Sequence, residues 1–583
     1  MAEESEYQVY TARAMAGRFA VMLGAATLLG FSGRMWFGLN LQQSTACAVF
    51  AAIILGTLLF WGFRLAIAFL GLAVLVMTNS LSIPEFIQSS ALDVILFLVG
   101  MMIVVGALRD LGFFTWVVQR IVVMPDISGR KFIVVTATAS ALLACAVDEV
   151  TAIIFISTLI FQVCDRLKLN PTPYIMIAVL ATNVGSAGTM MGNPVGIFIG
   201  SRAGLRFGDF MVWSFPLMLV ALAVTIALTL FFFRRDLRQF DVNLAARLAR
   251  NLTLAPRVDV PFWPGAILLA ATVGTIGMHH QLENLCGLQP NSMLIVAPLV
   301  CAGVVMLLRG HRARHYVERE VDWWTLLFFM LLFAVAGTLE HTGVAEKMAA
   351  GFTGLYGSSS IVLIPVILLV AAVGSAFVDN VIFVAAFAPV IEELGSTMKA
   401  MPLWWALLFG ACFGGNITMI GSTANIVALG MLEKKSSGGM GFFRWLKVGL
   451  PAALAVLAVS GAGLMVLSQW MPDRPGVVGF DRLNRDFQGK RVIVRAVPVP
   501  GEVKAEWLGG YAGKLSETDR LIRLSEPGRA VEDNPVILVA VLKGDMAVPP
   551  SERAVRRFTG QLYNSGADCR LLMVERIEEE SGR

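Results

Sequence analysis

The chain has 583 residues, 57% of them hydrophobic and only 15% charged, and its mean hydropathy is +0.72. This composition excludes an ordinary soluble globular protein and indicates a polytopic membrane protein. The formal net charge of +5 is small for this length, and the basic residues form no patch typical of nucleic-acid binding. We therefore expect the lipid bilayer, and no nucleic acid, among its partners.

The first residues, MAEESEYQVY, are acidic and lack the basic region of a secretory signal, so we expect the first helix to be retained. Before residue 471 we count about ten to twelve apolar blocks of roughly 18 to 28 residues, each long enough to cross a hydrocarbon core of about 30 Å. Residues 17–78 are expected to form three of these spans, within an N-terminal part that covers residues 1–91.

Cysteine and histidine give no sign of a metal centre. The seven cysteines lie mostly inside apolar blocks without a CxxC spacing, and the five histidines lie at block ends or in loops. We interpret the cysteines as small core residues and expect no His/Cys metal site inside the membrane. Apart from a coupling ion, no cofactor is expected.

One region of the chain occurs twice. ILFLVGMMIVVGALRDLGFF, from Ile95, aligns with LLFFMLLFAVAGTLEHTGVA, from Leu326, at an offset of 231 residues, and the same offset places Asp148 on Asp379. Further on, GSAGTMMG from Gly185 aligns with GGNITMIG at an offset of 229. These matches predict two homologous halves, 92–235 and 323–470. The linker between them, 236–322, should contain two spans, near 261–279 and 290–308.

Basic residues set the expected orientation, because short cytoplasmic loops carry the excess of Arg and Lys. Arginine-rich loops follow residues 233 and 308, and we expect both of them, and the N-terminus, on the cytoplasmic side of an inner membrane. Basic residues also flank residues 131–165 at both ends, so this segment should enter and leave on the same side. Its two arms, about 16 residues each, would rise only about 24 Å, which predicts a re-entrant hairpin.

If the two halves have opposite topology, the matching hairpin near 360–395 opens to the other side, and the two turns meet near the midplane. The expected fold is therefore an all-α polytopic membrane protein with an inverted repeat, two re-entrant helical hairpins and two broken helices. Residues 471–583 differ in composition, with β-branched runs at 491–498 and 536–542 and a helical pattern near 550–565. We expect them to form a small soluble α/β domain that regulates transport or binds an unidentified partner.

Three acidic residues lie inside the predicted hairpins: Asp148, Glu149 and Asp379. A carboxylate in hydrocarbon costs at least a few kcal/mol, so such residues usually face a water-filled path, a partner or an ion. One interpretation is that they only cap the helices of the hairpins. The recurrence of Asp in both halves favours a shared ion site, with Asp148 and Asp379 as candidate sodium ligands.

Each half also contains a polar, glycine-rich interruption, at 181–194 and 414–425. Glycine lets a helix unwind, while Thr, Ser and Asn offer oxygen atoms to a hard cation. Small residues also let transmembrane helices pack closely, which accounts for the glycines but less well for the asparagines. The candidate residues for binding an ion or substrate are Asp148, Glu149, Thr151, Asn183, Thr189, Asn193, Asp379, Asn380, Asn416, Thr418, Ser422, Thr423 and Asn425.

Residues 40–470 resemble the ion transporter superfamily, which includes arsenite permeases, bacterial sodium/proton antiporters, citrate and dicarboxylate transporters and the melanosomal P protein. The resemblance is carried by VDNV at 378–381, similar to the family's DNV hairpin, and by GNITMIGSTAN at 415–425, similar to its GGNxTxIGxxAN loop. It implies a scaffold with two hairpins, elevator-type alternating access and coupling to sodium or protons.

The chain departs from the P-protein-like branch in two places. Asp148-Glu149-Val150-Thr151 stands where that branch has Asp-Asn-Val-Thr, and Gly192-Asn193-Pro194-Val195-Gly196 stands where it has GDPPN. A second acid is therefore gained in the first hairpin and another acid is lost. We expect Glu149 to titrate during transport, because a desolvated carboxyl beside Asp148 favours its neutral form.

These features predict an ion-coupled secondary transporter, and not an enzyme, because no mid-span histidine is available for catalysis. Sodium/proton antiport is slightly favoured, since the candidate site is rich in carboxylates and shows no intramembrane Lys or Arg. Transport of arsenite or of an anion such as citrate, a dicarboxylate or sulfate is the alternative, because helix N-termini can hold an anion. An ion channel is a more remote one. A second copy of the chain is a further candidate partner.

Overall fold

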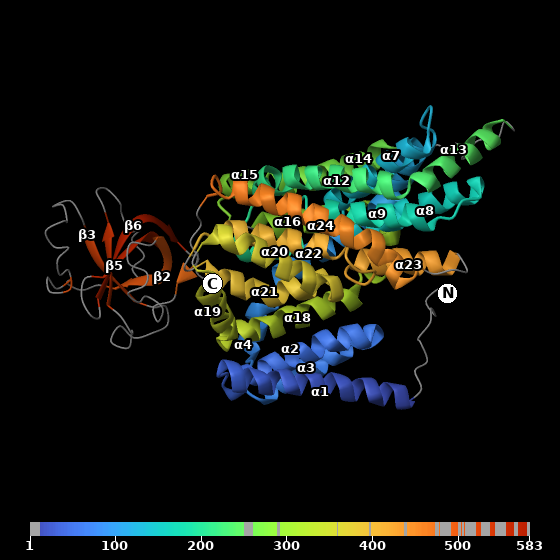
Figure 1. Cartoon of the computed structure of the whole chain (residues 1–583). Coiled ribbons are helices and arrows are strands. Elements are labelled where there is room, and N and C mark those ends of the chain that lie inside the picture. The colour runs from blue at the N-terminus through green and yellow to red at the C-terminus, as the bar shows by residue number, and fades with distance from the viewer. Residues whose placement is uncertain are drawn as a thin grey trace. The chain divides into compact units, whose positions relative to one another are not determined.

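The computed structural model describes residues 12–249, 260–288, 292–357, 359–395, 398–435 and 440–472, and parts of the C-terminal region. Those parts are 477–478, 491–499, 503, 507, 520–525, 537–542, 556–564 and 569–579. The chain divides into two compact units, which are described separately (Figure 1). The first unit comprises Met1–Phe352, Ile361–Val390 and Pro402–Trp470, and the second comprises Thr353–Ser360, Ile391–Met401 and Met471–Arg583.

The first unit begins with the three predicted N-terminal helices, α1 (Ala12–Phe37), α2 (Leu41–Leu59) and α3 (Arg64–Met77). The turn between α1 and α2 depends on Gly38, which has a left-handed φ of +60° that glycine adopts without strain. Asn40 then begins α2 through a capping box, in which the Asn40 side chain accepts from the Gln43 amide and the Gln43 side chain accepts from the Asn40 amide.

The elements of the two halves then recur at the offsets seen in the sequence. α5 and α18 both have 19 residues, and α7 and α20 both have 18. The first half contains α5 (Leu92–Asp110), α6 (Phe113–Val122), α7 (Gly129–Ala146), α8 (Glu149–Leu167), α9 (Thr172–Gly185), α10 (Pro194–Ala203) and α12 (Phe215–Phe232). Their counterparts are α18 (Trp323–His341), α19 (Val344–Tyr356), α20 (Ser360–Phe377), α21 (Asn380–Leu394), α22 (Met401–Gly414), α23 (Thr423–Lys435) and α24 (Phe442–Leu467).

The remaining helices lie before, within and between the two halves. They are α4 (Ile83–Ser89), α11 (Phe207–Asp209), α13 (Arg234–Leu248), α14 (Trp263–Gly277), α15 (His279–Cys286), α16 (Ser292–Leu308) and α17 (Ala313–His315). The two spans expected in the linker correspond to α14 and α16. The division of the chain at the predicted domain boundaries stays a prediction.

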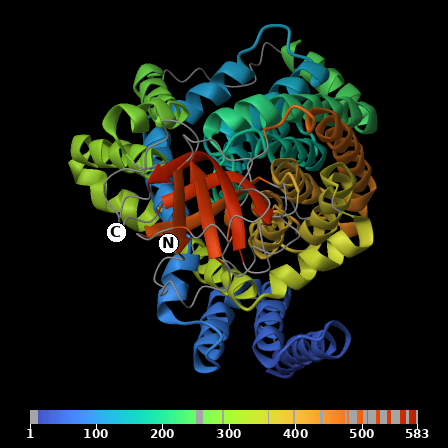
Figure 2. The same cartoon turned by 90° about the vertical axis from the view of Figure 1, so that its left-hand side faces the viewer.

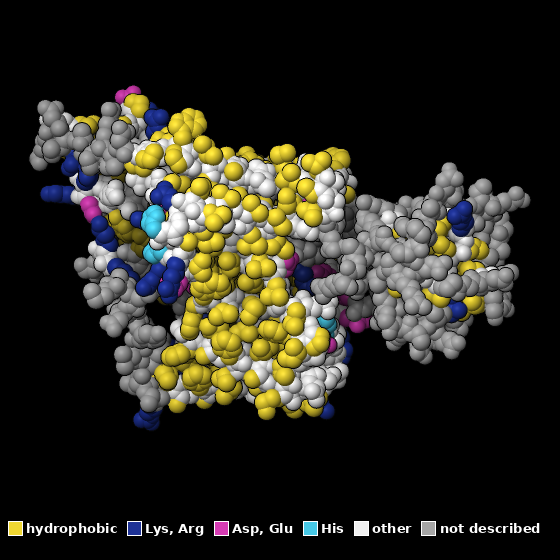
Figure 3. Space-filling model, turned by 180° about the vertical axis from the view of Figure 1, so that it is seen from behind, with side chains coloured by type: hydrophobic (Ala, Val, Ile, Leu, Met, Phe, Trp, Pro, Cys, Tyr) yellow, Lys and Arg dark blue, Asp and Glu magenta, His cyan; other side chains and the backbone are white. Residues whose placement is uncertain are grey.

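Length and composition make this a multi-pass membrane protein. In the part of the chain that the structure describes, nine helices are long and apolar enough to cross a membrane, or ten if α16 and the bent segment after it form one span. Several predicted spans, including α3 and α14, are shorter apolar helices of 10–17 residues. Apolar side chains cover a broad area of the face in Figure 3, with basic side chains gathered beside it. Such a surface is the one that lipid chains would contact.

The second unit contains the predicted C-terminal sheet (Figure 2). Its strands are β1 (Val477–Val478), β2 (Arg491–Val499), β3 (Arg520–Ser525), β4 (Ile537–Leu542), β5 (Arg556–Asn564) and β6 (Cys569–Glu579). β2 pairs antiparallel with both β3 and β5, β4 pairs parallel with β6, and the order β2-β3-β4-β6-β5 closes on itself. This is the strand arrangement of the five-stranded Greek-key barrel called the OB-fold.

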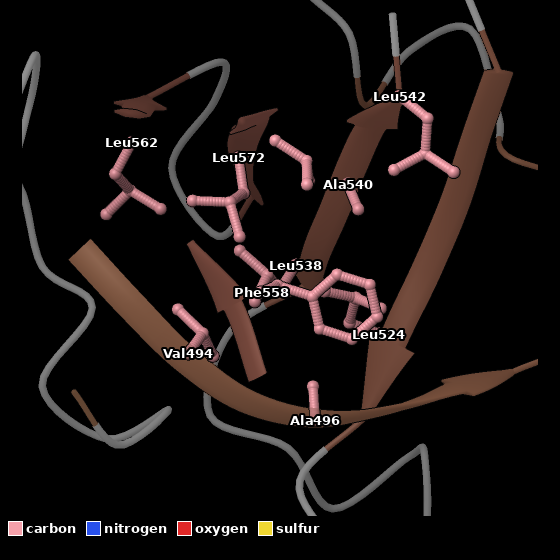
Figure 4. Close-up of a cluster of buried hydrophobic side chains, with 10 residues drawn as sticks. Val494, Ala496, Leu524, Leu538, Ala540, Leu542, Phe558, Leu562 and Leu572 are labelled. Atoms are coloured by element: carbon pink, nitrogen blue, oxygen red, sulfur yellow. The ribbon is translucent and has the colours of Figure 1, made fainter. Parts of the chain in front are cut away.

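The barrel interior is filled by side chains that alternate along its strands (Figure 4). Leu538 and Ala540 of β4 lie in this core with Phe558 and Leu572. The intervening Val539 lies in a second cluster on the other face of the sheet. Both faces of β4 are thus buried, which explains its uninterrupted apolar sequence.

The prediction of a helix near 550–565 is wrong for the residues that the structure describes there, because Arg556–Asn564 form strand β5. In RRFTGQLYN, Phe558 and Leu562 point into the barrel core. A spacing of four residues is close to one helical turn of about 3.6 residues and equals two strand periods of about 2.0 residues. It therefore fits one face of a helix and one face of a strand equally well. Pairing with β2 and β6 decides in favour of the strand.

Candidate functional site

The first hairpin consists of α7 and α8, joined at Val147 and Asp148. Asp148 begins α8 in the way expected of an N-cap: its Oδ1 accepts from the Thr151 amide at 2.7 Å, and its backbone is extended. At the other end, the start of α7 and the end of α8 both contact α13: the Gly129 amide donates to Asp241, and the Leu167 carbonyl accepts from Asn243. The two arms therefore return to the same end, as a hairpin requires.

The second hairpin consists of α20 and α21. Near its open end, the Ser360 hydroxyl donates to the Lys399 carbonyl at 2.9 Å. At its turn, the buried Asp379 accepts from the Val381 amide at 3.0 Å and from the Thr423 hydroxyl at 2.6 Å. Asp379 thus caps α21 and also binds the start of α23. The two aspartates thus occupy equivalent positions, and Asp379 makes an additional contact with the polar break of its own half.

A polar break follows each hairpin, between α9 and α10 and between α22 and α23. In the first half the Thr189 hydroxyl donates to the Cys145 carbonyl at 2.5 Å. In the second half the Thr418 hydroxyl donates to the Ala376 carbonyl. The two hydrogen bonds are equivalent in the repeat. In each half, a threonine of the break thus binds the last turn of the first hairpin helix, α7 or α20.

Asn183 joins the two halves. Its Nδ2 donates to the Oδ1 atoms of Asn416 and Asn425, both at 2.8 Å, and its Oδ1 accepts from the Ser422 hydroxyl at 3.0 Å. Asn425 in turn donates to the carbonyls of Gly415 and Thr418, at 2.8 and 2.9 Å. All four side chains are at most 2% exposed. Three asparagines and a serine that the sequence places far apart therefore form one buried network.

The contacts between the halves are reciprocal. Asn183 of the first half binds Ser422 of the second, and Cys412, the equivalent of Asn183, accepts a hydrogen bond from Asn193, the equivalent of Ser422, at 3.1 Å. This reciprocal pattern, in which residue i contacts j and their counterparts contact each other, is the one that a two-fold axis between the halves would produce.

Glycine permits the close approach of helices that this network needs. A Cβ on Gly185 would meet the backbone of Ala141, and a Cβ on Gly414 would meet the backbone of Ala372. The two contacts are equivalent in the two halves. In each, α9 or α22 lies directly on the first arm of its own hairpin.

Two polar atoms at the site have no hydrogen-bond partner in the described part of the chain. They are Oε2 of Glu149 and Oδ1 of Asn380, on side chains that are 3% and 2% exposed. The carboxyl of Glu149 interacts with Ser186 and Asn380, and the charges of Asp379 and Asp148 repel it. Buried acceptors usually have a donor or a cation, so these atoms mark a place that a proton or a cation can occupy.

Helix ends contribute a different electrostatic feature. α8, α10, α21 and α23 all begin at the hairpin turns and breaks, at Glu149, Pro194, Asn380 and Thr423. The N-terminus of a helix carries a partial positive charge and unpaired amides, which favour an anion. The site thus combines acidic side chains with four positive helix ends.

Across the described residues, no three His, Cys, Asp or Glu side chains are placed to hold one metal ion. A sodium ion would therefore need hydroxyl, amide or backbone oxygens beside a carboxylate, and Asp379 with Thr423 offers such a pair. The assignment of Asp148 and Asp379 as ligands stays a prediction.

Sequence reasoning missed three residues near the predicted ones. The Ser186 hydroxyl accepts from Asn193 and donates to the Asn183 carbonyl, both at 3.0 Å. Cys412, which we had interpreted as a small core residue, accepts from Asn193. The offset of 229, which sets Cys412 on Asn183, was the signal that could have identified it.

Arg64 is the third of these residues. It is 6% exposed at the start of α3, donates to the Thr325 hydroxyl at 2.9 Å and lies over the Phe328 ring at 5.0 Å. Its charge interacts with those of Asp379 and Asp322. Because it stands at the end of a predicted span, it resembled an ordinary flanking arginine.

Together, many apolar helices and a buried polar network that joins two repeated halves define a multi-pass membrane protein of the transporter class. A family model described as citrate transporter (CitMHS) matches residues 50–410. An uncharacterized transporter of Mycobacterium tuberculosis is 34% identical over 387 residues, which is 65% of this chain and 86% of that protein. The chain belongs to the citrate transporter family.

More distant relatives agree with this class. An uncharacterized transporter of Synechocystis is 25% identical over 431 residues, 69% of this chain and 93% of that protein. The human P protein is 24% identical over 463 residues, 66% of this chain and 54% of its own length. The crystal structure of the YdaH transporter of Alcanivorax borkumensis aligns with a TM-score of 0.46 and 17% identity, over 69% of this chain and 89% of that one. The family match and the curated transporters, with the P protein among them, confirm the resemblance to the ion transporter superfamily.

Proposed function

We propose that this permease is an ion-coupled secondary transporter whose coupling cation, sodium or a proton, binds among Asp148, Glu149 and Asp379. The observation that carries the proposal is the buried carboxyl of Glu149, whose Oε2 has no partner in the described residues and which two further acids repel. A buried charge in this position is stabilised when a cation or a proton neutralises it.

Exchange of sodium for protons is the form we favour. The neighbouring Asp379 has the hydroxyl of Thr423 at 2.6 Å, which supports a sodium site, while Glu149 is the group best placed to carry a proton. A single buried guanidinium, that of Arg64, is too little to neutralise three carboxylates. Net negative charge at the site therefore favours cations over anions.

Transport of a small anion is the second candidate, and one observation favours it. Four helices begin at the site, and their positive ends can hold carboxylate, oxyanion or arsenite oxygens while the coupling cation sits on the acids. The family's description as citrate transporter points the same way. In this form Asp379 and Glu149 bind the cation that drives uptake, and the substrate contacts the helix ends.

We further propose that the two halves are inverted with respect to the membrane, which is an inner membrane with the N-terminus on the cytoplasmic side. The reciprocal contacts between Asn183 and Ser422 and between Cys412 and Asn193 support a two-fold relation. An axis in the membrane plane would make the hairpins open to opposite sides, and would allow alternating access around a fixed midplane site.

The test is reconstitution into liposomes with imposed sodium or proton gradients, screened with sodium, arsenite, citrate, dicarboxylates and sulfate. The isosteric variant Asp379→Asn should abolish coupled flux while keeping the wild-type elution profile and thermal unfolding. Asp126→Asn, in an exposed loop, is the matched control and should transport normally. Dissipation of a gradient without fixed coupling would indicate a channel, and normal transport by Asp379→Asn would contradict the proposed site.

A further inference from the structure

Helix α13 lies against the base of the first hairpin, directly after a membrane span. It begins at Arg234, two residues after α12 ends at Phe232. Its apolar stripe, formed by Leu237, Phe240 and Leu244, is buried, and Phe240 stacks on Phe132 of α7 with ring centroids 5.2 Å apart. The helix is therefore held against the hairpin by a narrow face, and its other faces are exposed.

Polar contacts fasten α13 to both arms of the hairpin. Asp241 accepts from the amide of Gly129, the first residue of α7, at 2.6 Å. Asn243 donates to the Leu167 carbonyl at 2.8 Å, and Arg247 donates to the Arg166 carbonyl at 3.0 Å, both at the end of α8. An acid at a helix N-terminus and a cation at a C-terminus each complement the helix dipole. Any movement of α13 is thus transmitted to both arms of the hairpin at its base.

The outer face of α13 is basic. Arg234, Arg235 and Arg238 are exposed, and of the two acids on the helix Asp236 is half-buried while the exposed Asp241 accepts from the Gly129 amide. Arg234 lies over the ring of Phe231 at 5.6 Å, and Phe231, at the end of the span, is 64% exposed. An arginine over an exposed aromatic ring at the end of a span marks the boundary between the hydrocarbon and the headgroups.

Apolar side chains also point away from the hairpin on α13. Val242 is 63% exposed and Leu248 is 56% exposed. Figure 1 shows α13 running on from the end of α12, so the arginines of its first turns lie next to the end of a span. The partner that matches both features is a bilayer surface with negative headgroups.

We propose that α13 is a docking surface for anionic phospholipid headgroups, and that the bound bilayer surface holds α13 and the base of the α7–α8 hairpin in place. Arg234, Arg235 and Arg238 contact the headgroups. Asp241, Asn243 and Arg247 transmit the restraint to the two arms. The lipid composition of the leaflet thereby regulates how readily the hairpin moves.

The test measures hydrogen exchange by mass spectrometry on the full chain in nanodiscs of phosphatidylcholine, with or without phosphatidylglycerol. Peptides from α13 and from the last turn of α8 should exchange more slowly when the anionic lipid is present. Near an anionic surface one arginine contributes roughly a factor of five in equilibrium constant, so two contribute about 30-fold. The variant Arg235→Gln/Arg238→Gln should therefore lose most of the protection that phosphatidylglycerol confers.

The control Arg314→Gln/Arg319→Gln removes the same charge from exposed positions outside α13 and should behave as the wild type. Equal exchange in the two lipids, or an equal loss in the control, would overturn the proposal. Asn243→Ala separates docking from transmission: α13 should keep its protection by anionic lipid, and the end of α8 should lose it. None of these readouts depends on the transported substrate.

Discussion

Glu149 and Asn380 occupy equivalent positions in the two halves, each directly after the aspartate that begins the second arm of a hairpin. Both side chains are buried, and each ends in an oxygen without a partner in the described part of the chain. A carboxyl can titrate and an amide cannot. The same place in the fold therefore has a proton-binding group in one half and a fixed dipole in the other.

We expect Glu149→Gln to remove pH dependence from transport. The amide has the shape of the protonated carboxyl but cannot release a proton, so the step in which Glu149 titrates is lost. Flux in proteoliposomes, measured over a range of pH, should vary in the wild type and be nearly flat in the variant. The exposed Glu433→Gln on α23 should keep the wild-type profile, and an unchanged profile in Glu149→Gln would show that another group carries the proton.

Asn183→Ala should destabilise the protein more than an ordinary asparagine substitution. It removes the partner of Asn416, Asn425 and Ser422 at once, and each buried polar group left unpaired costs about 1–3 kcal/mol. The midpoint temperature of thermal unfolding in detergent should fall by several degrees. Asn284→Ala, on the exposed side of α15, is the control. Equal midpoints for the two variants would mean that the network contributes little to stability.

At the scale of elements, the positions of the four hairpin helices could be predicted because flanking charges and a repeat mark them in the sequence, while their re-entrant course stays a prediction. Basic residues at both ends of 131–165 predicted a segment that returns to its starting side, and the offset of 231 predicted the second hairpin. The structure places α7, α8, α20 and α21 at those positions. Asp148 and Asp379 could be found because they recur in register.

The sequence could not predict contacts that depend on the packing of distant elements. The three partners of Asn183 lie more than 230 residues away, and no local pattern selects them among the other asparagines. From the sequence, residues Arg234–Leu248 were interpreted only as part of an arginine-rich loop. The side chains of α13 that contact Gly129 and Leu167 are of types common on exposed helices, so they gave no signal. The prediction of a helix at the position of β5 was wrong for a related reason. The spacing of Phe558 and Leu562 fits a helix and a strand, and pairing with β2 and β6 decides for the strand.

The crossings of α9 on α7 and of α22 on α20 predict a strong effect of single methyl groups. Gly185→Ala or Gly414→Ala would press a Cβ into backbone atoms that cannot rotate away, and overpacking of this kind costs about 1–3 kcal/mol. Gly274→Ala on α14 meets nothing within 4 Å and should be neutral or slightly stabilising. Thermal unfolding of the three variants tests the contrast. If Gly185→Ala and Gly414→Ala had the same unfolding midpoint as Gly274→Ala, α9 would not be in close contact with α7, nor α22 with α20.

At the scale of the whole molecule, transport and the C-terminal barrel are expected to be separable. The hairpins, the breaks and the Asn183 network are formed by residues before 471, and the match to the citrate transporter family ends at residue 410. Deletion of residues 474–583 should therefore leave a folded membrane part with coupled flux in proteoliposomes. A change in the dependence of flux on a regulator would assign the barrel a regulatory role, whereas loss of folding would contradict the separation.

The barrel itself should fold when residues 471–583 are expressed alone. Its five strands close, so no long strand edge is left to aggregate, and its interior contains a contiguous apolar cluster that includes Leu538, Leu572 and Phe558. Phe558 is fully buried there, and Phe558→Ala should cost about 3–5 kcal/mol, a large fraction of the stability of a domain of this size. Arg520→Ala, at an exposed position on β3, should have little effect. Circular dichroism of the isolated domain should show strand structure that melts cooperatively. A non-cooperative melt in the wild type, unaltered by Phe558→Ala, would mean that the barrel needs the membrane unit to hold its core together.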